Sequence, residues 1–64
     1  MTTLHECHVV VSLPDLCILW VGTNWHEAVE AAEDFGRYST EIQVWIGSER
    51  TIRYRNVQNE WVII

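Results

Sequence analysis

One segment of the chain carries sequence signals for both ends of a helix. Asn24 precedes the segment and Glu27 follows three positions later, the spacing of a capping box with Asn in the role of Ser or Thr. Gly36 then supplies a residue suited to a left-handed helix end. The apolar residues between these signals recur at the helical period: Trp25, Ala28, Val29, Ala32 and Phe35. We therefore expect one helix that begins at Trp25 and packs its alanines closely against a sheet.

The residues before this helix read as a β-hairpin. Residues 5–13 and 16–21 are rich in β-branched and large apolar residues, and Pro14-Asp15 between them is a turn signal. If Leu13 pairs with Leu16, one face carries the pairs Val11–Ile18 and Val9–Trp20, and the other carries Val10–Leu19 and His8–Val21. Both faces of this hairpin are then apolar.

The residues after the helix predict three more strands. Residues 41–46 alternate, with Ile42, Val44 and Ile46 on one side and Glu41, Gln43 and Trp45 on the other. A three-residue loop at 47–49 places Val44 opposite Ile52 and Glu41 opposite Arg55 on the strand 50–56, and such an exposed ion pair contributes about a few tenths of a kcal/mol. For the last hairpin we prefer a three-residue loop at 57–59 to a two-residue one. The three-residue loop pairs Tyr54 with Val62 and Arg55 with Trp61.

The predicted fold is therefore α+β, in the order ββαβββ, with one helix on one face of an antiparallel-rich sheet. The chain has 64 residues, so we expect a single domain over residues 1–64, with only Met1 to Leu4 as a loose terminus. A core of this size contributes roughly 3–5 kcal/mol of stability. Self-association as a homodimer is the expected source of further burial.

One helix can cover only one face of the sheet, which leaves apolar and arginine side chains on the other face. The residues expected there for partner binding are Trp45, Arg53, Arg55, Trp61, Ile63, Leu19 and Val21, and Val10 lies on the same side. Trp and Arg are enriched in binding hot spots, and apolar patches of this size mark interaction surfaces. The pattern predicts a non-catalytic protein-interaction module, and dimerisation through the same face is a second explanation that can coexist with the first.

A different class of function is also compatible with this face. Trp and Arg together can stack a nucleobase and hold a phosphate, so a protein that binds or sequesters a small molecule or nucleotide is the alternative, although no glycine-rich phosphate loop is present. Duplex nucleic acid is disfavoured as a partner because the formal net charge is −5, with nine acidic residues, four arginines and no lysine. A deep aromatic pocket would favour the ligand, and a flat apolar face the protein partner.

Catalytic and metal chemistry find little support. The nearest nucleophile and base are Ser12 and His8, which share one face of the predicted hairpin, so we expect no enzyme and no cofactor. Strand parity places Cys7 inward with His5, and Cys17 outward with His8. We therefore expect no metal site, and two free thiols in place of a disulfide.

No membrane segment is expected, since the apolar stretch 9–21 is interrupted by Ser12, Pro14 and Asp15. The chain also begins without a signal-peptide pattern. These two features predict a protein of the cytoplasm, in a bacterium or an infected host cell.

The layout of a hairpin, the helix N-W-H-E-A-V-E-A-A-E-D-F-G and a closing strand with Trp61 resembles small accessory proteins of bacteriophages. The likeness covers most of the chain and rests on layout, so it transfers no functional residue. It implies a viral protein that inhibits a host or defence protein by binding it.

Overall fold

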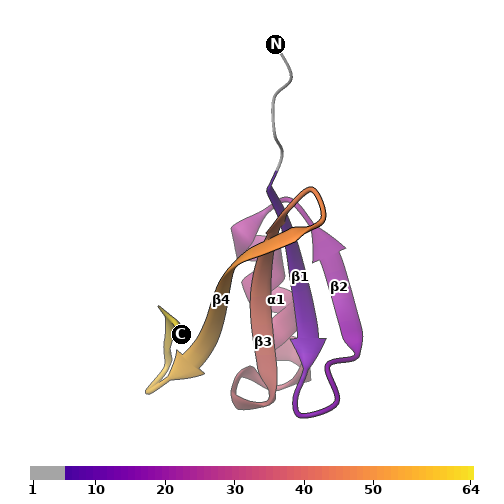
Figure 1. Cartoon of the computed structure of the whole chain (residues 1–64). Helices are drawn as coiled ribbons and strands as arrows, with labels where there is room; N and C mark the ends of the chain where they lie inside the picture. The colour runs from indigo at the N-terminus through magenta and orange to yellow at the C-terminus, as the bar shows by residue number, and fades with distance from the viewer. Residues whose placement is uncertain (1–5) are drawn as a thin grey trace.

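The computed structural model describes residues 6–64, which form a five-stranded antiparallel sheet with one α-helix and a short 3-10 helix (Figure 1). The elements are β1 (Glu6–Ser12), β2 (Ile18–Gly22), α1 (Trp25–Phe35), η1 (Arg37–Ser39), β3 (Thr40–Ile46), β4 (Glu49–Val57) and β5 (Glu60–Ile63). Their order across the sheet is β2-β1-β3-β4-β5. The predicted α+β class and ββαβββ order are confirmed. His5 and the predicted loose terminus lie outside the described residues.

Helix α1 has the ends that its sequence predicts. The backbone N–H of Glu27 donates to Asn24 Oδ1 at 3.1 Å, and the N–H of Gly36 donates to the carbonyl of Ala32 at 2.9 Å. Gly36 has a φ of 142°, in a region that residues with a Cβ rarely adopt. Phe35, however, is 55% exposed, so the apolar face of the helix ends one turn earlier than the periodicity predicts.

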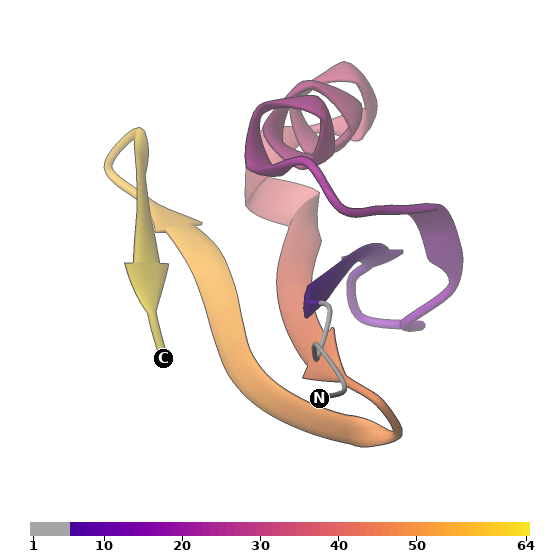
Figure 2. The ribbon, with the colours of Figure 1, turned by 90° about the horizontal axis from the view of Figure 1, so that it is seen from above.

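The core forms where α1 lies on the sheet, on one side only (Figure 2). Its fully buried residues are Val10, Ala28, Ala32 and Ile42, and Trp20, Trp25, Tyr54 and Trp61 are among the half-buried residues packed around them. The prediction that Val10 and His8 lie on the uncovered face is therefore wrong. The more apolar side of β1, with Val9 and Val11, faces away from the helix, so its own pattern does not set its orientation. Pairing with β3 does: Val10 lies opposite Ile42 and shares its helix-facing side.

The hairpin of β1 and β2 differs from the expected pairing by one residue. Val11 lies opposite Ile18 as predicted, but Val10 pairs with Trp20 and Val9 with Val21. The register changes because of a β-bulge, in which Leu19 is the extra residue on β2. Trp20 is thereby turned towards the core.

The pairing of β3 with β4 confirms the predicted register over most of its length. Val44 lies opposite Ile52 and Glu41 opposite Arg55. The loop contains two residues, Gly47 and Ser48, where three are predicted, and a bulge at Thr51 compensates for the difference.

The last hairpin has a two-residue loop in place of the predicted three-residue loop. Gln58 and Asn59 both have positive φ, 52° and 67°, as a type I′ turn requires. Trp61 therefore pairs with Asn56, and Ile63 with Tyr54. The predicted pairs of Arg55 with Trp61 and of Tyr54 with Val62 are wrong, because a one-residue slip moves every side chain of β5 to the opposite face.

Candidate interaction site

We call the sheet face opposite α1 the outer face. It carries Trp45, Arg53 and Arg55 as predicted, together with Val21, which pairs with Val9. Trp61 and Ile63 do not belong to it, because Trp61 packs against the core and Ile63 lies beside Tyr54 on the helix side, where it is 65% exposed. The seventh predicted residue, Leu19, is the extra residue of the β2 bulge. The structure therefore brings four of the seven predicted residues onto one face.

Glu41 is the centre of the outer face and is fully buried. Arg53 donates to both of its carboxylate oxygens, from Nε at 3.1 Å and from Nη2 at 2.9 Å. Arg55 adds a third bond from Nε at 3.0 Å. The sequence predicts only a weak surface pair between Glu41 and Arg55, whereas the structure shows one buried carboxylate shared by two arginines.

These bonds change the acidity of Glu41. Burial alone would raise the pKa of its carboxyl group, but the hydrogen bonds from Arg53, Gln43 and Arg55 outweigh burial and hold the pKa at about 2, against an ordinary value of 4.5. Glu41 is therefore ionised at neutral pH and keeps both guanidinium groups in place.

The hydrogen-bonded cluster extends along β3 to Trp45. Gln43 Nε2 donates to Glu41 Oε2 at 2.7 Å, and the indole Nε1 of Trp45 donates to Gln43 Oε1 at 3.0 Å. Side chains two residues apart share one face of a strand, so this series follows directly from the alternation of residues 41–46. The orientation of the Trp45 ring is thereby fixed.

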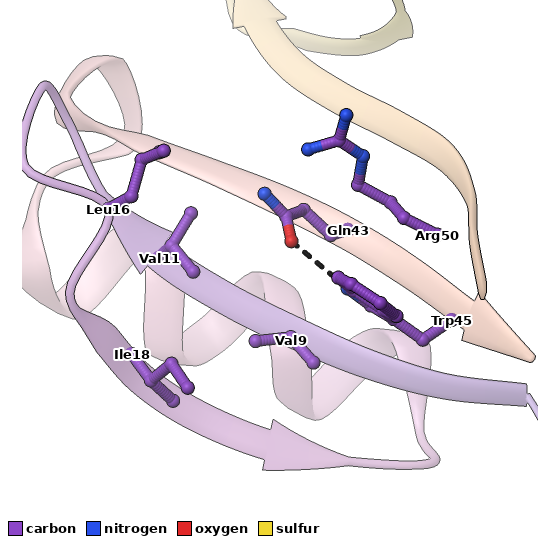
Figure 3. A pocket seen from close by; sticks show the side chains of 7 residues that line it. All are labelled: Val9, Val11, Leu16, Ile18, Gln43, Trp45 and Arg50. Carbon is purple, nitrogen blue, oxygen red and sulfur yellow. Dashed lines mark hydrogen bonds between the residues drawn. The ribbon is translucent and has the colours of Figure 1, made fainter. Parts of the chain in front are cut away.

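Beside Trp45 the outer face contains a shallow pocket with a volume of about 310 Å³ (Figure 3). Its lining comes from β1, the β1–β2 hairpin, β3 and the start of β4: Val9, Val11, Leu16, Ile18, Gln43, Trp45 and Arg50. Figure 2 shows β4 strongly bent, with its first residues on the side of the sheet away from the helix. Sequence reasoning missed Arg50 because a bulge that no periodicity reveals moves it opposite Trp45. It missed Ile18 because the predicted side of β1 is reversed, so that Val11 and its partner Ile18 lie on the outer face.

The residues considered for metal binding and catalysis do not converge. Cys7 lies opposite Trp45 on the outer face. His8 lies on the helix side, where its ring centroid is 5.9 Å from that of Trp25. The predicted orientations of both residues are therefore reversed. Ser12 Oγ accepts a hydrogen bond from the backbone N–H of Cys17 at 3.1 Å. Cys7 and Cys17 are both free thiols. Within residues 6–64 no group of three or more candidate metal ligands is found, and no helix there is long and apolar enough to cross a membrane.

Comparisons with known proteins found no matching family model, no matching curated protein and no matching solved structure. The resemblance to bacteriophage accessory proteins remains a prediction.

Proposed function

We propose that this chain is a non-catalytic protein-binding module whose contact surface is the outer face around Glu41, Arg53, Arg55 and Trp45. The observation that carries the proposal is the pair of arginines fixed on one buried carboxylate, beside a tryptophan and exposed aliphatic side chains. Arg and Trp in such a setting are typical of interface hot spots.

The geometry of the arginines supports binding. Arg53 and Arg55 use only part of their five N–H donors on Glu41, and their side chains are 36% and 41% exposed. A partner carboxylate or carbonyl can accept from the remaining donors. Because Glu41 already holds both side chains, a partner has less conformational entropy to remove on binding.

We also propose that β2 pairs with the β2 strand of a second copy. It is an edge strand of the sheet, it contains no charged residue, and Ile18 and Val21 are 68% and 54% exposed. Natural edge strands usually carry charges or other features that block pairing with another chain. Antiparallel pairing of two β2 strands would create a twofold-symmetric homodimer in which the backbone N–H and C=O groups of this edge are hydrogen-bonded.

Affinity capture tests the binding proposal. The tagged wild-type chain, an Arg55→Gln variant and an Arg37→Gln variant are compared as baits in a cell extract by quantitative mass spectrometry. Arg37 is the matched control because it forms an ion pair with Glu33 at the end of α1, away from the outer face. A specific partner should be depleted with Arg55→Gln and retained with Arg37→Gln. Equal recovery with all three baits would contradict the proposal.

A further inference from the structure

Three irregular features of the backbone meet at the pocket on the outer face. Leu16 has a φ of 59°, which is unfavourable for a residue with a branched side chain, and its side chain lines the pocket. The two bulges of the sheet, at Leu19 and at Thr51, flank the pocket on opposite sides. Strained residues and bulges are concentrated at functional sites, where they redirect side chains.

Each bulge places one side chain in the pocket. If the Val10–Trp20 register continued without the bulge at Leu19, Ile18 would lie opposite Ser12 on the helix side; with it, Ile18 lies opposite Val11 on the outer face. On β4 the bulge at Thr51 likewise moves Arg50 from a position opposite Ile46 to one opposite Trp45. The hydroxyl of Thr51 donates to the Val44 carbonyl at 3.0 Å, which secures this second bulge.

The charge of the pocket is positive and uncompensated. Among residues 6–64, ion pairs link Glu41 to Arg53 and Arg55, and none involves Arg50. The Glu41 oxygens already accept four hydrogen bonds from Arg53, Arg55 and Gln43. Arg50 therefore faces the pocket with free donors, opposite the apolar side chains of the β1–β2 hairpin (Figure 3).

We propose that this pocket binds a small organic anion with a flat apolar body. Its carboxylate or other anionic group contacts Arg50, and its apolar body lies between the Trp45 ring and Ile18. The volume of about 310 Å³ is at the lower end of the range for small-molecule sites, so the ligand is compact. The pocket shares Trp45 with the proposed protein contact, but Arg53 and Arg55 do not line it, so its anion-binding group is a different arginine.

A pair of matched probes tests the site. 2-Naphthoate carries the anionic group and 2-naphthamide is its neutral counterpart; each is titrated into the ¹⁵N-labelled chain while the indole Nε1–H resonance of Trp45 is followed by NMR. We expect naphthoate to shift this resonance and to bind about tenfold more tightly than the amide, since a charge-assisted hydrogen bond is lost with the amide. No shift of the resonance at millimolar naphthoate, or equal affinities for the two probes, would overturn the proposal.

Two variants assign the effect to the pocket residues. Arg50→Gln should remove the preference for the acid over the amide, while Arg37→Gln, which removes the same charge elsewhere, should keep it. Retention of the preference in Arg50→Gln would refute the role of this arginine.

A third variant tests the wall of the pocket formed by Leu16. Leu16→Gly relieves the positive φ and removes this wall, so it should weaken naphthoate binding at least threefold without lowering the urea midpoint. These outcomes do not depend on a protein partner, so failure here is distinguishable from failure of the capture experiment.

Discussion

Glu41 is the residue on which the outer face depends most. Replacing it with Gln leaves Arg53 and Arg55 without a counter-charge in a site built around a buried carboxylate. We expect Glu41→Gln to lower the free energy of unfolding by about 2 kcal/mol, less than for a fully buried pair because both arginines are half-exposed. Urea unfolding at pH 7 measures this change. Glu30→Gln, on the exposed side of α1, is the control and should alter stability little.

The same carboxylate predicts how stability depends on pH. The pKa of Glu41 is about 2 in the folded chain, against an ordinary value of 4.5 that applies to the unfolded chain. Between pH 2 and pH 4.5 the unfolded chain therefore binds more protons than the folded chain. The stabilisation by ionised Glu41 is fully present above pH 4.5 and is lost as the pH falls towards 2. Its upper limit is about 3 kcal/mol. Solvent screening around the half-exposed arginines reduces this value. Urea titrations between pH 6 and 2.5 should show a smaller loss of stability for Glu41→Gln than for the wild type. Equal losses would contradict this assignment.

The two tryptophans of β3 and β5 should behave differently on truncation. Trp61 packs against the core, so Trp61→Ala should lower the free energy of unfolding by about 2 kcal/mol or more. Trp45 lies on the outer face beside the pocket, so Trp45→Ala should cost about 1 kcal/mol or less. Urea unfolding of both variants under the same conditions decides this, and equal losses would contradict the placement of Trp61.

At the scale of elements, the helix start is the clearest case of a local signal that determines structure. Asn24 Oδ1 accepts the backbone N–H of Glu27, which would otherwise lack an intrahelical partner. Asn24→Ala should lower the free energy of unfolding by about 1 kcal/mol. Asn24→Asp should retain most of the stabilisation by the cap, because Asp is also a good N-cap residue. Thermal unfolding followed by circular dichroism at 222 nm measures both. An unchanged midpoint for Asn24→Ala would show that the cap contributes nothing to stability.

The β2 edge gives a prediction about self-association. Val21 is exposed on this strand, and a lysine there introduces the kind of charge that blocks edge pairing. Sedimentation equilibrium at micromolar concentration should show a dimer for the wild type and a monomer for Val21→Lys. A monomeric wild type would contradict the proposed pairing of β2 strands.

The elements could be predicted from sequence because their signals are local. The cap at Asn24, the alternation of residues 41–46 and the turn residues all act within a few positions. Two features could not be predicted in this way. The bulges at Leu19 and Thr51 depend on how whole strands pair. The orientation of β1 is decided by its neighbour β3, since the more apolar side of β1 faces away from the helix. The outer face was therefore predicted in part: Trp45, Arg53 and Arg55 are correctly placed, Arg50 is missed, and the residues of β5 are reversed by the two-residue turn.

At the scale of the whole molecule, the charges are distributed unevenly. Helix α1 contains Glu27, Glu30, Glu33 and Asp34, whereas Arg53 and Arg55 lie on the outer face, and Arg50 lines its pocket. Three of the four arginines of an acidic chain thus lie on the face that α1 leaves uncovered. This separation of charge favours an oriented approach of a partner, with the outer face towards acidic groups.

Binding through the outer face is tested by the dissociation constant of the captured partner for two variants that alter opposite sides of the molecule. Trp45→Ala removes the tryptophan of the outer face, and Glu30→Ala removes a carboxylate on the exposed side of α1; circular dichroism verifies that both are folded. We expect Trp45→Ala to raise the dissociation constant about thirtyfold, corresponding to about 2 kcal/mol, and Glu30→Ala to leave it unchanged. Normal binding by Trp45→Ala together with loss of binding in Glu30→Ala would assign the contact to the acidic helix and rule out the outer face.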